Sequence, residues 1–255
     1  MDLHLTSKVI IVTGGARGIG KAIVQALTDE GAIAVIVDKS EPAEEHTSSK
    51  QQKHFFQADL SSAEACKRII EEVVEKFGQI DGIVNNAGNN DGISLQNGSP
   101  DAFIKSMTTN AGHYYYMVHY ALPSLKASHG SIVNIGSKTS VTGQGATSGY
   151  VAAKGAILAL TREWAVELLP WSIRVNAVVP AEVATPLYDA WIHGFANPQE
   201  KLKQVTSKIP LENRLTRPEE IANTVLFLLS DRSSHTTGQW LFVDGGYTHL
   251  DRSLS

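Results

Sequence analysis

Apolar runs and amphipathic segments alternate along the whole chain. Short runs rich in β-branched residues have the pattern of buried parallel strands, and they predict strands at 8–13, 33–38, 53–57, 80–85, 131–136, 173–178 and 240–243. Longer segments with apolar residues at helical spacing predict helices at 18–30, 61–77, 100–126, 149–169, 187–194, 198–206 and 218–230. The chain is therefore predicted to alternate strand and helix throughout.

This alternation determines the expected fold class. Strands that are joined by helices form right-handed crossovers, so we expect an α/β fold with a doubly wound parallel sheet of the Rossmann type and helices on both faces. No internal repeat, low-complexity tract or linker divides the chain, and residues 1–255 are expected to form a single domain. The polar stretch 39–52 is expected to be a solvated loop with a short helix.

A glycine-rich turn follows the first predicted strand. Gly14, Gly18 and Gly20 lie between the apolar run 9–12 and a helical pattern. Glycines at this place allow a tight turn, let the backbone approach a pyrophosphate, and direct a helix N-terminus toward it. Asp38 ends the second strand about 20 residues further on, where an acidic residue binds the adenosine ribose. The sequence therefore predicts a dinucleotide site.

Ser137, Tyr150 and Lys154 form the second candidate group. Tyr150 and Lys154 are four positions apart, so both side chains lie on one face of the predicted helix. A neighbouring ammonium favours the phenolate, and Tyr150 could then exchange a proton with a substrate hydroxyl. Ser137 ends a predicted strand, where its hydroxyl could hold the same substrate oxygen. From the residues alone, a stacked surface pair of Tyr and Lys remains an alternative.

These motifs together resemble the short-chain dehydrogenase/reductase family: TGGARGIG at 13–20, NNAG at 85–88, Asn110, and the set Ser137, Tyr150 and Lys154. The resemblance covers residues 8–246. It implies that Tyr150 is the catalytic acid/base and that Ser137 orients and polarises the substrate oxygen. It further implies that Lys154 binds the nicotinamide ribose and lowers the pKa of Tyr150, and that Asn110 holds a water molecule of a proton relay.

The same resemblance implies the residues that bind the cofactor. They are Gly14, Arg17, Gly18, Ile19, Gly20, Asp38, Lys39, Asp59, Leu60, Asn86, Ala87, Gly88, Tyr150, Lys154, Pro180, Val183 and Thr185. NAD is expected rather than NADP, because a carboxylate at Asp38 would accept both ribose hydroxyls and repel a 2′-phosphate. Arg17 and Lys39 argue for NADP, since basic groups pair with phosphate.

Two departures from the broad family concern the substrate side. His113 stands where the family usually has Gly, and Pro180-Ala181-Glu182 replaces Pro-Gly before Thr185-Pro186. With the segments around them, these residues are similar to a bacterial subgroup that oxidises free aldoses, the L-fucose dehydrogenases. His113 itself is expected to be a structural helix histidine.

A sugar pocket also requires several polar groups and aromatic faces. Residues that could supply them are Asn89, Asn90, Gln144, Glu182, Tyr188, Trp191 and His193, and about half of this set is expected to be uninvolved. Ser137 is expected to contact the substrate as well. The expected reaction is NAD-dependent oxidation of an aldose, such as L-fucose, at C1 to its lactone. The alternatives are reduction of a 3-oxoacyl thioester, or a protein that senses a dinucleotide without catalysis.

Composition adds limits on partners. The net charge is −4 and no basic stripe is present, so nucleic acid is not expected to bind. No segment has eighteen consecutive apolar residues, which indicates no membrane span and a cytoplasmic protein. The single cysteine, Cys66, is expected to be a buried, inert thiol, and no metal site is expected. The apolar helix after Lys154 predicts a subunit interface, most simply in a homotetramer and otherwise in a dimer.

Overall fold

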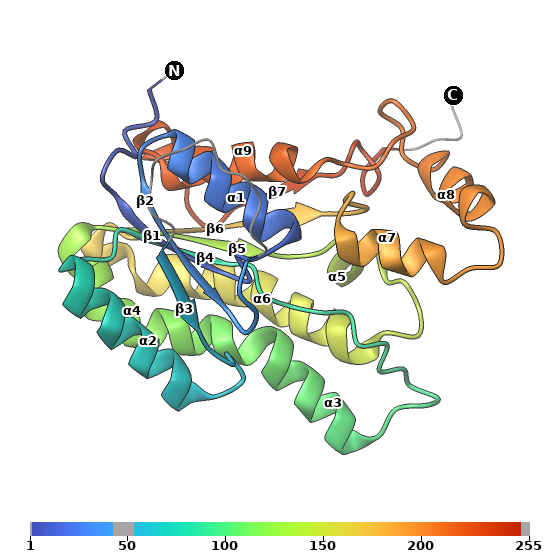
Figure 1. Cartoon of the computed structure of the whole chain (residues 1–255), viewed down its shortest axis with the longest axis horizontal. Helices are drawn as coiled ribbons and strands as arrows, with labels where there is room; N and C mark the ends of the chain where they lie inside the picture. Colours follow the sequence, from blue (N-terminus) through green and yellow to red (C-terminus); the bar gives the residue numbers. More distant parts are fainter. Residues whose placement is uncertain (1, 43–53, 251–255) are drawn as a thin grey trace.

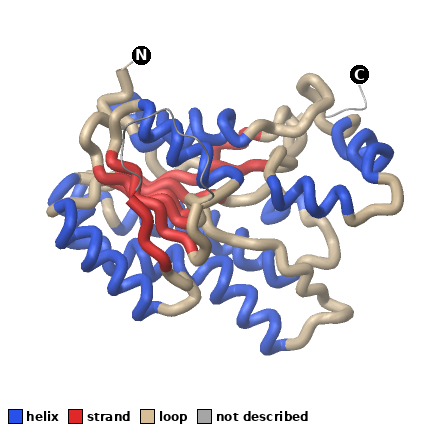
Figure 2. The backbone as a smooth tube through the Cα atoms, in the orientation of Figure 1, coloured by secondary structure: helices blue, strands red, loops and turns tan. Residues whose placement is uncertain are grey.

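A parallel sheet of seven strands forms the centre of the molecule (Figure 2). The computed structural model describes residues 2–42 and 54–250. The strands are β1 (Val9–Thr13), β2 (Ile33–Asp38), β3 (His54–Gln57), β4 (Gly82–Asn85), β5 (Ser131–Ile135), β6 (Arg174–Pro180) and β7 (Trp240–Val243). Each lies at a position predicted from the apolar runs. Strands β1, β4 and β5 are buried along their full length, because helices cover both faces of the sheet.

The order of the strands in the sheet is β3-β2-β1-β4-β5-β6-β7. Strands β2 and β3 lie on one side of β1, and β4 lies on its other side. Val12 of β1 therefore pairs with both Ile36 of β2 and Val84 of β4. This reversal in the strand order is the topological switch point, where ligands of doubly wound sheets bind outside the carboxyl ends of the strands. The fold therefore places the predicted dinucleotide site at the carboxyl ends of β1 and β4.

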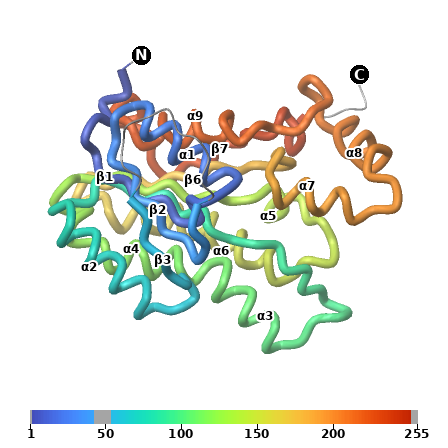
Figure 3. Tube along the Cα trace, viewed as in Figure 1, coloured from blue at the N-terminus to red at the C-terminus, as the bar shows by residue number. Residues whose placement is uncertain are grey.

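Helices cover the two faces of the sheet (Figure 1). The α-helices are α1 (Gly18–Asp29), α2 (Ala63–Phe77), α3 (Pro100–Met107), α4 (His113–Ser128), α5 (Thr139–Thr142), α6 (Ser148–Glu167), α7 (Pro186–His193), α8 (Pro198–Thr206) and α9 (Pro218–Leu229). One core joins α1 and α9 to the sheet, and a second joins α2, α4 and α6 to its other face. Helices α1 and α9 come from opposite ends of the chain and lie side by side (Figure 3).

The predicted helix 100–126 is wrong as a single continuous helix. The structure divides this segment into α3, a π-helical turn at Thr108–Gly112, and α4. The side chain of Asn110 explains the interruption, because its Nδ2 donates to the carbonyl oxygen of Ser106 at 3.1 Å and competes with the backbone for that acceptor. Such π turns are frequent at functional sites, and this one contains a predicted site residue.

Two smaller features complete the comparison with the sequence. Cys66 is buried, and burial raises the pKa of its thiol to about 12, as expected for an inert cysteine. The short helix α5 was not predicted. The expected loop and helix at 39–52 lie largely outside the described residues. In the described part of the chain, no helix is long and apolar enough to cross a membrane.

Candidate functional site

The glycine-rich turn between β1 and α1 has little space for side chains. Gly14 and Gly18 have φ angles of +65° and +56°, in the left-handed region that favours glycine. A Cβ atom at Gly20 would lie 2.1 Å from the carbonyl oxygen of Gly14, so the first turn of α1 packs directly against the loop. Gly18 faces Thr185 across the turn, where a Cβ atom at Gly18 would lie 3.4 Å from the Thr185 methyl. The turn therefore leaves backbone close to any phosphate bound at the N-terminus of α1.

Asn86 fixes this turn to β4. Its Nδ2 donates to the carbonyl oxygens of Thr13 and Gly14 at 2.9 and 3.1 Å. The Thr13 hydroxyl in turn accepts from the backbone N–H groups of Asn86 and Ala87, at 2.9 and 3.1 Å. The carboxyl ends of β1 and β4 are thus joined at the switch point by side-chain hydrogen bonds. Asn86 and Ala87 were predicted here, while Thr13 was not.

Asp38 lies at the carboxyl end of β2, beside the glycine-rich turn. Its carboxylate is buried and accepts from the N–H of Ala16 at 3.2 Å and from the N–H of Ser40 at 3.3 Å. A carboxylate has about four lone-pair positions, so these two bonds leave acceptors for ribose hydroxyls. Arg17 and Lys39 are both exposed at the surface. The charge nearest to a ribose at this place is therefore negative.

Asp59 and Leu60 follow β3 at the next strand end. The Asp59 carboxylate accepts from the backbone N–H and the hydroxyl of Ser61, at 3.0 and 2.8 Å. These hydrogen bonds lower the pKa of Asp59, so it is ionised. The Leu60 side chain packs in the core against α2. The structure thus places an exposed carboxylate and a buried leucine beside the region expected to hold adenine.

Ser137 and Tyr150 face each other at the carboxyl end of β5. Ser137 follows β5 after Gly136, and Tyr150 lies in the first turn of α6. Burial raises the pKa of the Tyr150 phenol, and its hydrogen bond with Ser137 acts in the opposite direction. The Ser137 hydroxyl also accepts from the Thr139 hydroxyl at 3.0 Å. A substrate oxygen between Ser137 and Tyr150 would therefore meet two hydroxyl groups.

Lys154 lies one turn after Tyr150 on the same face of α6, but its ammonium has other partners. Its Nζ donates to the Tyr114 hydroxyl at 2.9 Å and to the Ile135 carbonyl oxygen at 2.7 Å, and it is 5.8 Å from the centre of the Tyr150 ring. Lys154 is buried, and burial lowers its pKa to about 7. Burial therefore shifts both groups toward their neutral forms, and the effect of the Lys154 charge on the pKa of Tyr150 stays a prediction.

Asn110 joins the π turn to the end of β4. Its Oδ1 accepts from the backbone N–H of Asn89 at 2.8 Å. A Cβ atom at Gly88 would lie 3.3 Å from this Oδ1 and 3.6 Å from the Nζ of Lys154, so Asn110, Gly88 and Lys154 meet at one point. The four predicted catalytic residues therefore come from β5, α6 and the π turn to one place beside the switch point.

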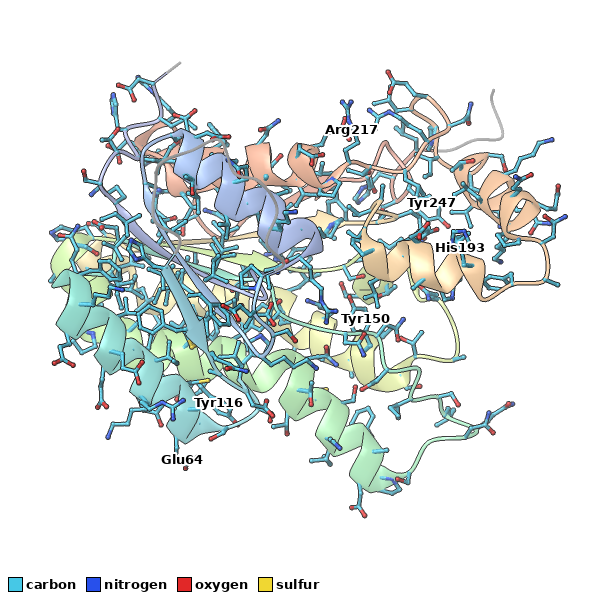
Figure 4. All side chains as sticks on the ribbon, viewed as in Figure 1. Glu64, Tyr116, Tyr150, His193, Arg217 and Tyr247 are labelled. Atoms are coloured by element: carbon cyan, nitrogen blue, oxygen red, sulfur yellow. The ribbon has the colours of Figure 1, made fainter. Side chains whose placement is uncertain are left out.

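A charged pair borders Ser137 on the other side. Lys138, directly after Ser137, forms an ion pair with Glu182 from the loop after β6, and both side chains are largely buried. The Lys138 ammonium lies 3.9 Å from the centre of the Tyr247 ring. Burial and the charge of Glu182 raise the pKa of Tyr188, so its phenol stays protonated beside the carboxylate. In the view of Figure 4, Tyr247 lies above α7 and Tyr150 below it.

The remaining predicted residues are dispersed around this cluster. Pro180 ends β6 and accepts from the backbone N–H of Lys138 at 2.9 Å. Val183 is buried, and Thr185 caps α7 by accepting from the N–H of Tyr188 at 3.2 Å. Trp191 is 46% exposed, and its ring centre lies 5.2 Å from that of Tyr188. The other predicted substrate residues are exposed on the surface, namely Asn89, Asn90, Gln144 and His193.

Four residues of the site were missed from the sequence: Thr13, Tyr114, Lys138 and Tyr247. Thr13 ends β1 and Lys138 directly follows Ser137, so their positions were signals the sequence contained. Tyr114 lies one helical turn after Asn110, which is a further local signal, whereas Tyr247 reaches the site from a distant segment that no local pattern marks.

Comparisons with known proteins agree with this geometry. Residues 14–248 match the family model described as enoyl-(acyl carrier protein) reductase. L-fucose dehydrogenase of Mus musculus is 34% identical over 246 residues, which cover 94% of this chain and 88% of that protein. The 3-oxoacyl-(acyl-carrier-protein) reductase FabG of Thermotoga maritima is 32% identical over 250 residues, which cover 96% of this chain and 99% of that protein.

Two solved structures are similar over nearly their whole length. The crystal structure of Cj0485 dehydrogenase is 47% identical in sequence, with a TM-score of 0.96 and coverage of 100% of this chain and 99% of the other. The ligand-free aldohexose dehydrogenase of Thermoplasma acidophilum is 30% identical, with a TM-score of 0.91 and coverage of 99% and 98%. The fold is thus shared, over nearly the whole chain, with two proteins described as dehydrogenases.

Proposed function

Since this chain belongs to the short-chain dehydrogenase/reductase family, whose enzymes act on hydroxyl or keto groups with a nicotinamide cofactor, we propose that it oxidises C1 of an aldose such as L-fucose to the lactone, with NAD⁺ as the hydride acceptor. The observation that supports a sugar best is the buried Lys138–Glu182 pair next to Ser137. Beyond their bond to each other, this ammonium and carboxylate have further donors and acceptors for sugar hydroxyls, whereas an apolar acyl chain offers no partner for them. The names of the mouse and Thermoplasma acidophilum relatives support the same substrate class.

The proposed chemistry uses the cluster at the end of β5. Tyr150 takes the proton of the C1 hydroxyl, and the Ser137 hydroxyl donates to the oxygen as it becomes a carbonyl. Because burial favours the protonated phenol, Tyr150 must first pass its proton to the proposed relay water, and the hydrogen bond with Ser137 favours this step by opposing the effect of burial on the pKa of Tyr150. Lys154 and Asn110 are proposed to hold the ribose and a water molecule of the proton relay. Bound NAD⁺ would supply the hydride acceptor.

The proposed choice of NAD over NADP rests on Asp38. The glycine-rich turn and the N-terminus of α1 fit a pyrophosphate, and the buried Asp38 carboxylate lies where the adenosine ribose would follow. A 2′-phosphate there would meet the carboxylate at contact distance, while Arg17 and Lys39 are exposed and can remain in water. The other proposed cofactor contacts come from Asn86, Gly88 and the loop that ends at Thr185.

A substrate panel tests the proposal. Purified protein is assayed with aldoses, polyols and hydroxyacyl compounds, each with NAD⁺ and NADP⁺, and the absorbance of the reduced cofactor is followed. We expect oxidation of at least one six-carbon or 6-deoxy aldose, with NAD⁺ preferred. Brisk reduction of an acetoacetyl thioester, without oxidation of any aldose, would instead assign the chain to the activity named for its FabG relative.

Variants of two predicted polar substrate residues refine this test. Gln144→Ala and Glu182→Gln are expected to lower kcat/KM for the best aldose by roughly 10-fold each, because each removes a partner for a sugar hydroxyl. The affinity for NAD⁺ should stay within a few-fold. Gln25→Ala, at an exposed position in the second half of α1, is the matched control and should not change the kinetics. Unchanged kcat/KM in both test variants would remove these residues from the sugar site.

The assembly and location of the protein are also proposals. We propose that residues 1–255 act as one domain in a homotetramer, with a dimer as the second choice. Exposed apolar side chains on and beside α6, such as Val166 at 68% and Leu169 at 57%, support a subunit interface there. Light scattering after size-exclusion chromatography gives the mass of the assembly directly. The cytoplasmic location stays a prediction.

A further inference from the structure

The ammonium of Lys154 is held by a residue that the proposed chemistry does not use. Tyr114 is fully buried, and its hydroxyl lies 2.9 Å from the Nζ of Lys154. The same hydroxyl donates to the carbonyl oxygen of Ile135 at 3.0 Å, and Lys154 donates to that carbonyl at 2.7 Å. Tyr114, Lys154 and the end of β5 therefore form a closed triangle of hydrogen bonds.

The position of Tyr114 explains why this triangle is rigid. Tyr114 lies in the first turn of α4, directly after the π turn that contains Asn110. Its single proton is used on the Ile135 carbonyl, so the oxygen presents a lone pair to Lys154. Full burial allows no other rotamer without a new cavity. The π turn thus places two site residues at once, Asn110 on one side and Tyr114 on the other.

The groups that face Lys154 are otherwise neutral. His113 and Tyr114 approach from α4, Asn110 from the π turn, and Tyr150 from α6 itself. Burial, and secondly the charge of Lys154, lowers the pKa of His113 to about 3, so this ring is uncharged near neutral pH. Burial raises the pKa of Tyr114, which stays protonated. Among the described residues, Lys154 has no ion pair, so hydroxyl and carbonyl oxygens must stabilise its charge.

We infer that Tyr114 is a positioning residue, whose buried hydroxyl keeps Lys154 charged and oriented within reach of Tyr150. The inference rests on the roles proposed above for Lys154 and Tyr150, but not on the identity of the substrate. Tyr114 does not act as a second acid or base, because its proton is bonded to the Ile135 carbonyl and full burial opposes its loss. Its contribution is to accept one hydrogen bond from an ammonium that burial destabilises.

Tyr114→Phe tests this inference, since it removes the hydroxyl and retains the ring. Hydrogen bonds to charged groups are strong enough that the loss of one should lower the pKa of Lys154 by about one pH unit. The ratio of wild-type kcat to variant kcat should then rise from about 2 at pH 6 to about 10 at pH 9. Tyr120→Phe, on the same helix but without this contact, is the matched control and should follow the wild-type profile.

Two outcomes would overturn the inference: an unchanged profile, or a loss of kcat by the same factor at every pH, which a purely structural role would produce. The assay uses whichever substrate and cofactor the wild-type protein turns over, so failure of the sugar proposal leaves this test intact. A titration of ¹³Cε-labelled lysines by NMR measures the pKa of Lys154 without any substrate, with Lys154→Met identifying the signal. An equal pKa in wild type and Tyr114→Phe would also overturn it.

Discussion

Replacing Lys154 by methionine should stabilise the protein at neutral pH and not at alkaline pH. Burial lowers the pKa of Lys154 from 10.5 to about 7 in the folded state. Between these values the unfolded chain binds a proton at this position and the folded chain does not, so the wild-type free energy of unfolding rises with pH. Each pH unit between 7 and 10.5 changes the wild-type free energy of unfolding by about 1.4 kcal/mol, which sums to about 5 kcal/mol.

The Lys154→Met variant has no ammonium to bury, but it lacks the two hydrogen bonds that Lys154 donates to Tyr114 and Ile135. Methionine has a similar length, and the Ile135 carbonyl keeps its bond from Tyr114, so no buried acceptor is left unpaired. A loss of about 1–2 kcal/mol for the missing bonds is expected. Lys154→Met should therefore be more stable than wild type by about 3 kcal/mol at pH 7, with the advantage falling by about 1.4 kcal/mol per pH unit and vanishing near pH 9.

Urea unfolding at one fixed protein concentration, followed by circular dichroism at half-unit steps from pH 7 to 9.5, measures this difference. The range stays below pH 10 because burial raises the pKa of Tyr150, which adds a pH dependence of opposite sign above that value. The effect of His113 differs between the two proteins, because the charge of Lys154 helps to lower its pKa, but it lies below pH 6.5 and therefore outside this range. If the difference in free energy of unfolding between the two proteins does not change with pH, burial does not lower the pKa of Lys154 and the reasoning is refuted.

Three further predictions concern the same site. Tyr150→Phe should lower kcat by roughly 100-fold or more with cofactor affinity nearly unchanged, and near-normal turnover would contradict its role as acid/base. Asp38→Ala should raise the KM for NAD⁺ by roughly 10-fold and reduce the preference over NADP⁺; a wild-type enzyme that already uses both equally would show that Asp38 does not discriminate. Gly20→Ala should lower the free energy of unfolding by about 1–3 kcal/mol and abolish NAD⁺ binding, because its Cβ would overlap the Gly14 carbonyl, whereas Gly155→Ala in α6, with open space around it, should be neutral or stabilising.

The arrangement of strands and helices was predictable because it is encoded locally. Apolar runs such as 9–12 and 33–37 mark buried strands whatever lies beside them, and alternation with helices then requires parallel crossovers. The glycine-rich turn was predictable for the same reason, since its positive φ angles and close contacts are properties of a short segment. Ser137, Tyr150 and Lys154 were proposed from residue type and spacing, while the family resemblance gave the group its roles and added Asn110.

The tertiary structure decided how these residues are charged and which partners they have. Lys154 bonds to Tyr114, 40 positions away, and Lys138 pairs with Glu182, 44 positions away, so no local pattern contains either contact. The π turn at Asn110 arises because a side chain competes with the backbone of its own helix, a choice that helical periodicity cannot reveal. Spacing alone placed Lys154 beside Tyr150 and predicted a lowered phenol pKa. Burial, which depends on every element packed around α6, raises the pKa of the tyrosine and lowers that of the lysine, and no spacing rule contains either effect.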